Sequence, residues 1–105
     1  MARLRDVCRY VRSKNAGPFW ITLDLFFDGE QNYARFRDAP TLSPEAVARI
    51  YGVDPGEVRR YLVDSLQVLK LSYPRAAPQG DAHERDMHGG QQYVRLLDVE
   101  LEAAV

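Results

Sequence analysis

The sequence predicts an α+β fold: a small antiparallel or mixed sheet with helices packed on one face. Residues 19–28 alternate strictly between two faces, and the apolar face carries Phe19, Ile21, Leu23, Leu25 and Phe27. Residues 58–63 and 66–73 are rich in β-branched, aromatic and aliphatic side chains, which is typical of strands. Between residues 30 and 51 the apolar positions follow helical spacing instead. Strands and helices in separate stretches of chain indicate the α+β class, with ferredoxin-like topology as the natural candidate.

The N-terminal segment, residues 3–12, leaves helix and strand open. Its apolar residues fall at helical spacing, yet its β-branched residues also suit a strand that enters a turn at 13–18, and we favour the strand. A short amphipathic helix is expected over 30–37. A second helix is expected over 44–51, where Ser43 can cap the first turn and Gly52 permits a left-handed end.

The C-terminal half is expected to end in a polar loop and a strand. Asp64 and Ser65 separate the two predicted strands as a turn, and Pro74 ends the second one. Residues 78–90 are polar and contain three glycines, which predicts a long functional loop. The segment 93–102 is interpreted as a last strand, whose apolar face is Tyr93, Leu97, Val99 and Leu101.

The composition is that of one compact globular domain spanning residues 1–105. Lys and Arg number 14 against 15 Asp and Glu, so only a local basic patch could bind a polyanion and nucleic acid is not an expected partner. Cys8 is the only cysteine, which excludes an intramolecular disulfide and fits a reducing cytoplasm. No apolar run approaches the ~20 residues that span a bilayer, so we expect a cytoplasmic protein without membrane contact.

A DNA-binding helix-turn-helix is one hypothesis for residues 48–63. Ala48 and Gly52 stand at the spacing of that motif, and a second helix could begin at Asp54. Such a recognition helix would present Asp54, Glu57 and Asp64 to phosphates, which is an unfavourable set of charges. Two packed helices, or a helix followed by a strand, are the favoured alternatives.

A metal site is a second hypothesis, for the loop GDAHERDMHGG at 80–90. His83, Asp86 and His88 supply imidazole and carboxylate groups that could bind Zn²⁺ or another divalent ion. Nothing in their spacing fixes a geometry, and a solvated loop has the same composition. We therefore predict no intrinsic metal site.

The third hypothesis is an anion-binding turn at RSKNAG, residues 12–17. Arg12 can hold a carboxylate with two hydrogen bonds, Lys14 is a mobile cation, and Ser13 and Asn15 add donors. Gly17 lets a ligand approach the backbone. A plain surface turn would use the same residues, so both interpretations stay open.

Five ordered motifs resemble one known family. They are LRDV near the N-terminus, RSKNAGPFWITLDLFFD, AVARIYGV, KLSYPR at 70–75 and HGGQQYVRLLDVEL at 88–101. Together they cover nearly the whole chain and resemble the small bacterial and archaeal proteins of domain of unknown function 4387. Members of that family are typically encoded beside, or fused to, a large protein similar to the acyclic terpene utilisation protein AtuA, which is linked to catabolism of branched isoprenoid acids as thioesters.

A shorter part of the chain is similar to the ferredoxin-fold C-terminal domain of AtuA-like proteins. That domain has an Arg-Ser-Gly-Asp-Lys-Gly turn where residues 12–17 read RSKNAG, and a Leu-Leu-Asp strand like residues 96–98. The family resemblance favours a strand over a recognition helix at 58–63. Family members more often have an Asp-x-x-Gly spacing than the HERD sequence found at 83–86, which argues against a general metal role there.

The resemblance implies an accessory subunit that docks on an AtuA-like partner and adds the 12–17 turn to a composite site for an organic acid or acyl thioester. In that site Arg12 or Lys14 would hold a carboxylate or phosphate. The expected ligand-binding residues are Arg12, Ser13, Lys14, Asn15, Gly17, Asp24, His88, Gln91 and Gln92. Two alternatives stay open: a standalone hydratase, isomerase or lyase that uses His88 with Asp86 or Asp24 as general acid and base, and a structural domain that forms a homo-oligomer. The sequence identifies no cofactor.

Overall fold

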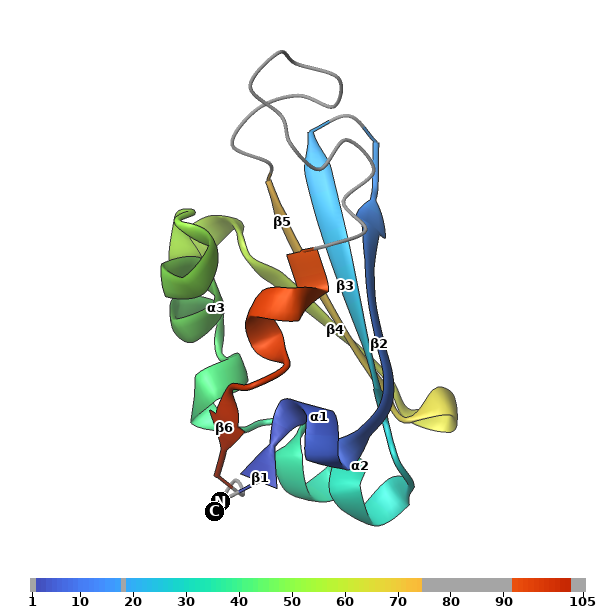
Figure 1. The fold of residues 1–105 in the computed structure, drawn as a ribbon. Helices are drawn as coiled ribbons and strands as arrows, with labels where there is room; N and C mark the ends of the chain where they lie inside the picture. Colours follow the sequence, from blue (N-terminus) through green and yellow to red (C-terminus); the bar gives the residue numbers. More distant parts are fainter. Residues whose placement is uncertain (1, 18, 75–91, 103–105) are drawn as a thin grey trace.

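A four-stranded antiparallel sheet forms one layer of the protein, and helices cover one of its two faces (Figure 1). The computed structural model describes residues 2–17, 19–74 and 92–102. The sheet order is β2-β3-β5-β4, with bounds Cys8–Asn15, Trp20–Phe27, Val68–Pro74 and Arg59–Val63 in that order. This arrangement confirms the predicted α+β class.

The sheet has the spatial order of a ferredoxin-like fold, but the chain runs through it in a different sequence. Strands β3 and β4 both pair antiparallel with β5 and are therefore parallel to each other, as in a split β-α-β unit. In the β-α-β-β-α-β order of the ferredoxin-like fold, the strand on the far side of β3 would come last, after a second helix. Here that edge position belongs to β2, which precedes β3 as its hairpin partner.

The helices are short and lie between the strands in sequence. The α-helices are α1 (Leu4–Val7), α2 (Glu30–Phe36) and α3 (Pro44–Tyr51). Single turns of 3₁₀-helix are η1 (Pro40–Leu42), η2 (Pro55–Glu57), η3 (Asp64–Leu66) and the longer η4 (Gln92–Leu96). A small second sheet pairs β1 (Ala2–Arg3) with β6 (Glu100–Leu101) beside the N-terminal end of the chain (Figure 1).

The hydrophobic core lies between the helices and one face of the sheet. Strand β3 contributes Ile21, Leu23, Leu25 and Phe27, each at most 2% exposed. The ring of Tyr33 in α2 packs edge-on against Phe27, with ring centroids 6.0 Å apart. Phe19 was expected on this core face, but it precedes β3 and is 56% exposed.

Helix α3 has the predicted boundaries at both ends. The Ser43 hydroxyl accepts a hydrogen bond from the backbone N–H of Ala46 at 3.2 Å. Gly52 follows the helix with φ of +69°, a left-handed conformation that suits glycine. The helix therefore begins directly after Ser43 and ends directly before Gly52, as the sequence predicts.

The N-terminal segment contains both of the elements left open by the sequence. Residues Leu4–Val7 form a single helical turn, and the strand β2 follows it directly. Both Leu4 and Val7 are buried, so the helical spacing serves the core, while Val11, the β-branched residue beyond the turn, joins the sheet.

The predicted C-terminal strand over 93–102 is wrong for most of its length. Residues Gln92–Leu96 form η4, and only Glu100–Leu101 pair as a strand. Tyr93, Leu96 and Leu97 stand at i, i+3 and i+4, so a helical turn also directs them towards the core, and Leu96 is fully buried there.

Residues 59–63 form the strand β4, which contradicts a recognition helix at this position. The segment Pro55–Glu57 makes only a single 3₁₀ turn, so the helix-turn-helix interpretation is excluded. Within the described ranges, no helix combines the length and the apolar character needed to cross a bilayer.

Candidate functional site

Residues 12–15 belong to a strand, not to the turn that the sequence predicted. Strand β2 continues to Asn15, which pairs with Ile21, so the reversal of the chain falls at 16–19. The backbone N–H of Ala16 donates to the carbonyl of Trp20 at 2.9 Å, and Gly17 adopts φ of +84°. The left-handed backbone angle of Gly17 allows the hairpin to close. A Cβ atom at this position would meet no neighbour, so the backbone angle alone favours glycine.

This extended backbone divides the predicted binding residues between the two faces of the sheet. Ser13 points to the core side, is 7% exposed, and accepts a hydrogen bond from the backbone N–H of Tyr93 at 3.1 Å. Arg12 and Lys14 project from the opposite side, which we call the open face because the described helices cover the other one. Ser13 therefore joins β2 to η4, while the two cations remain candidates for ligand contact.

Asp24 lies on the open face between two cations and is completely buried. Its Oδ2 accepts a hydrogen bond from Arg12 Nε at 2.8 Å, and its Oδ1 lies 3.2 Å from Lys70 Nζ. Burial by itself raises the pKa of this carboxyl, but the hydrogen bonds and charges of Lys70 and Arg12 outweigh burial, so its pKa is lower than the ordinary 3.8. Asp24 is ionised at neutral pH.

These contacts make Asp24 unsuited to general acid–base catalysis. A catalytic acid or base needs a pKa near the working pH and access to the substrate proton. Asp24 has a lowered pKa, no exposed surface, and a cation beside each oxygen. We therefore assign Asp24 to positioning Arg12 and Lys70.

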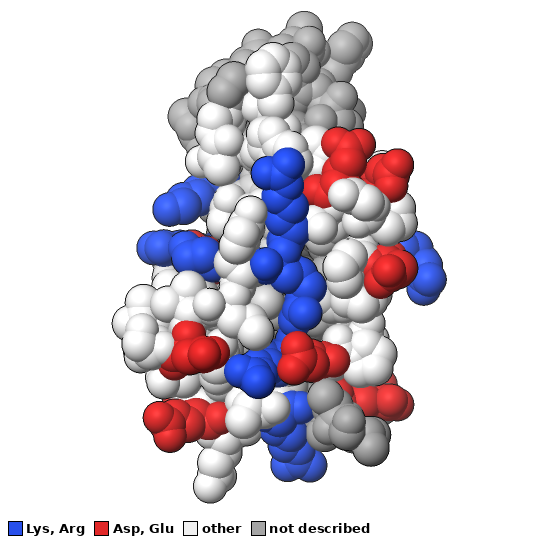
Figure 2. All heavy atoms as spheres, turned by 180° about the vertical axis from the view of Figure 1, so that it is seen from behind, with Lys and Arg blue, Asp and Glu red and all other residues white. Residues whose placement is uncertain are grey.

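Aromatic and cationic side chains lie close together on the open face. Tyr10 and Tyr61 are 55% and 51% exposed. The Arg59 guanidinium lies over the Trp20 ring, 4.7 Å from its centroid. Arg12 lies over Phe26 at 5.3 Å. Seen from behind the view of Figure 1, basic side chains run down the middle of the molecule and acidic ones lie mainly to either side (Figure 2).

The alternation predicted for residues 19–28 implies that Trp20 and Asp24 share a face, but the sequence analysis missed Arg59, Tyr61 and Ser72. These three belong to β4 and β5, and the pairing register brings them beside β3. Together with Ala16 and Trp20, they line a shallow depression of about 190 Å³. The alternation within each strand was available in the sequence, whereas the alignment of one strand with the next was not.

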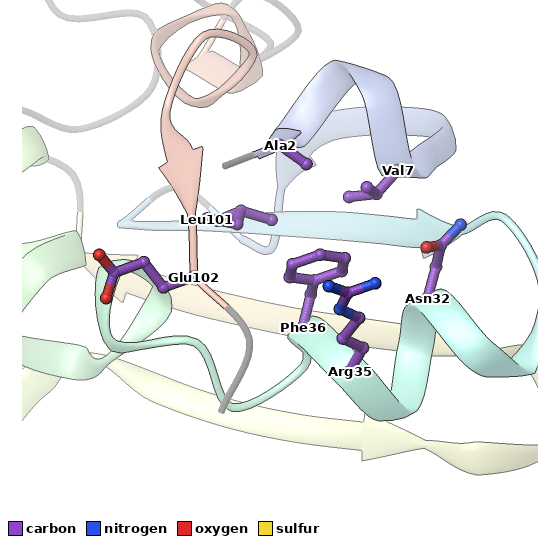
Figure 3. Close-up of a pocket in the computed structure, with 7 residues that line it drawn as sticks. All are labelled: Ala2, Val7, Asn32, Arg35, Phe36, Leu101 and Glu102. Atoms are coloured by element: carbon purple, nitrogen blue, oxygen red, sulfur yellow. The ribbon is translucent and has the colours of Figure 1, made fainter. Parts of the chain in front are cut away.

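A larger hollow of about 620 Å³ lies between α1, α2 and β6 (Figure 3). Ala2 and Val7 lie on one side of it, and Phe36 and Arg35 of α2 lie on the other. Arg35 stacks over Phe36 at 5.3 Å, and Asn32 donates to the Asp28 carbonyl, so both polar groups already have contacts. This hollow contains none of the predicted ligand-binding residues.

Several predicted site residues lie outside the described residues: His83, Asp86, His88 and Gln91. Gln92 begins η4. Among the residues described, no three His, Cys, Asp or Glu side chains gather in a way that could hold a metal ion. Burial raises the pKa of the Cys8 thiol to about 12, so that side chain stays protonated and is not a nucleophile at neutral pH.

Comparison with known proteins gives one match. No curated protein and no solved structure is significantly similar to the chain. The sequence model described as "Domain of unknown function (DUF4387)" matches residues 4–100, which is most of the chain. The motifs noted in the sequence lie mainly within this range, and the chain belongs to the DUF4387 family.

Proposed function

We propose that this protein is a small accessory subunit that docks on an AtuA-like protein and contributes its open face to a composite site for an organic acid or acyl thioester. The observation that carries this proposal is the open face itself. One side of the sheet is packed against helices, whereas the other presents half-exposed Tyr10 and Tyr61 beside cations. Aromatic and arginine side chains on one surface are typical of protein interfaces.

The residue contacts on this face also suit a shared site better than a complete one. Arg12 and Lys70 are both partly exposed, at 43% and 37% of their side chains, and both are oriented by the buried Asp24. The depression beside them measures about 190 Å³, less than the ~300 Å³ at which ligand pockets usually begin. A second protein would supply the missing walls.

The proposal is tested by co-expression with an AtuA-like protein, followed by size-exclusion chromatography with light scattering. We expect a stoichiometric complex whose mass is the sum of the two chains. Tyr10→Asp and Tyr61→Asp should each weaken the complex, because each places a carboxylate in the interface. Arg49→Asp places the same group on the exposed surface of α3 and should leave the complex intact.

Two results would contradict the proposal. One is a wild-type protein that elutes alone at micromolar concentration in the presence of the AtuA-like protein. The other is a complex that Arg49→Asp disrupts as strongly as Tyr10→Asp and Tyr61→Asp do, because the contact would then not be specific to the open face. Circular dichroism of each variant verifies that it is folded.

A further inference from the structure

Four polar side chains form a row across the open face, one from each strand of the sheet. Lys14 in β2 is paired with Thr22 in β3, Thr22 with Ser72 in β5, and Ser72 with Arg59 in β4. Directly opposite residues of antiparallel strands point to the same side of a sheet. The row therefore reads cation, hydroxyl, hydroxyl, cation, and the two hydroxyl oxygens lie 3.1 Å apart.

The neighbouring row shows how this sheet accommodates a negative charge between cations. In this neighbouring row, two residues away in each strand, the side chains are Arg12, Asp24, Lys70 and Tyr61, from β2, β3, β5 and β4 in that order. There the carboxylate of Asp24 occupies the middle and contacts a cation on either side, at 2.8 and 3.2 Å. In the row of Lys14 and Arg59, hydroxyl groups occupy the middle positions instead.

Lys14 and Arg59 have no acidic partner among the residues that the structure describes. Arg59 is nevertheless positioned, because its guanidinium lies 4.7 Å from the centroid of the Trp20 ring. The depression of about 190 Å³ lies next to it and is lined by Trp20, Tyr61 and Ser72. Arg59, the Ser72 hydroxyl and aromatic surface thus meet at the depression, and Lys14 lies at the other end of the same row.

We propose that this row binds the oxyanion end, carboxylate or phosphate, of a small organic ligand. Arg59 has the planar donor pair that matches such a group. One of the two paired hydroxyls of Thr22 and Ser72 donates to the other, so the second keeps its proton to donate to the ligand. Lys14 adds charge from the β2 side, and Trp20 contacts the adjoining apolar part of the ligand. The oxyanion lies beside Arg59 and supplies the negative charge that Asp24 supplies in the neighbouring row.

The volume limits what the row can hold. A water molecule occupies ~30 Å³ in the liquid, so a depression of about 190 Å³ has the volume of roughly six water molecules. That suits a short branched acid or the acidic end of a longer molecule. The choice of an organic acid rests on the proposed function, whereas the oxyanion contact depends only on this row.

The test is a titration of the purified full chain, in which tryptophan fluorescence monitors binding. Trp20 is the only tryptophan, and Arg59 stacks on it, so its emission reports on the row directly. The probes are 3-methylbutanoate, inorganic phosphate and the uncharged 3-methylbutanamide, at constant ionic strength. We expect saturable binding of an oxyanion with a dissociation constant near the millimolar range, and no saturation with the amide.

Variants separate this site from general charge effects. Lys14→Gln and Arg59→Gln should each weaken oxyanion binding by about fivefold or more, as expected for loss of a charged hydrogen bond. Because Arg59→Gln changes the surroundings of Trp20, its binding is also followed by amide chemical shifts. Arg49→Gln removes an exposed arginine on α3 and is the matched control, for which we expect unchanged binding.

The outcomes distinguish the ligand sources and the two proposals. Tighter binding of 3-methylbutanoate assigns the row to a carboxylate, and tighter binding of phosphate assigns it to a phosphate group. Equal responses to acid and amide, or equal losses in Arg59→Gln and Arg49→Gln, would overturn the row as an oxyanion site. Oxyanion binding by a chain that never joins its partner would refute the accessory-subunit proposal alone, and a complex without oxyanion binding would refute the row alone.

Discussion

At the scale of single residues, Asp24 is expected to matter most for stability. Its carboxylate has no exposed surface and contacts Arg12 and Lys70. Asp24→Asn removes the charge and leaves both cations unpaired, although their partial exposure allows hydration. We therefore expect a loss of about 1–3 kcal/mol in the free energy of unfolding, below the value for a fully buried pair. Urea unfolding at pH 7, followed by circular dichroism, measures it.

The dependence on pH gives the same prediction a second test. The folded-state pKa of Asp24 is lower than its ordinary value, so its ionised form stabilises the folded protein at higher pH. The difference between wild type and Asp24→Asn should be constant from about pH 7 to 5 and shrink below about pH 4, as the carboxyl is protonated. Asp98→Asn, which removes an exposed partner of Arg5, should cost less than about 0.5 kcal/mol. Equal losses in both variants would contradict a special role for Asp24.

At the scale of elements, the clearest prediction concerns the start of α3. The Ser43 hydroxyl accepts the N–H of Ala46, and no other cap is needed for this helix to begin at Pro44. Ser43→Ala should lower the free energy of unfolding by about 1 kcal/mol. Ser65→Ala, an equal change on an exposed residue of η3, should lower it much less. Similar chemical denaturation midpoints for the two variants would show that the cap contributes nothing.

Local signals explain which elements the sequence could predict. Helix α3 has a cap, a first-turn proline and a terminal glycine, and β3 has strict alternation, so each element follows from its own residues. The C-terminal segment was misassigned because Tyr93, Leu97 and Leu101 fit a strand while Tyr93, Leu96 and Leu97 fit a helical turn. Contact with the core at Leu96 decides between these patterns, and that contact is not local.

The candidate site was less predictable than the elements that carry it. The sequence singled out Arg12, Lys14 and Asp24, but it grouped them with Ser13, which turns to the core. The row that ends at Arg59 crosses all four strands, and its members are up to 58 residues apart, from Lys14 to Ser72. Their alignment depends on the register of the three strand pairings. Register follows from how the whole sheet packs, so no window of sequence contains this site.

At the scale of the whole molecule, charge is distributed unevenly on a nearly neutral chain. The formal net charge is −1, yet one side of the molecule carries a central run of basic side chains (Figure 2). An interface built on that side should be sensitive to salt, because screening shortens the reach of exposed charges from ~10 Å at 0.1 M to ~3 Å at 1 M. The same uneven distribution explains how a slightly acidic protein could attract an acidic partner surface.

Under the accessory-subunit proposal, we therefore expect the affinity for the AtuA-like partner to fall about tenfold or more between 0.05 and 0.5 M NaCl, mainly through slower association. Surface plasmon resonance with the immobilised partner measures both rate constants across this range. Lys14→Gln should reduce the salt dependence, because it removes one of the exposed charges that act across the interface, while Arg49→Gln on α3 should not. An affinity that stays constant or rises with salt would mean that apolar contact by Tyr10 and Tyr61 dominates, and that the cations of this face serve the ligand and not the partner.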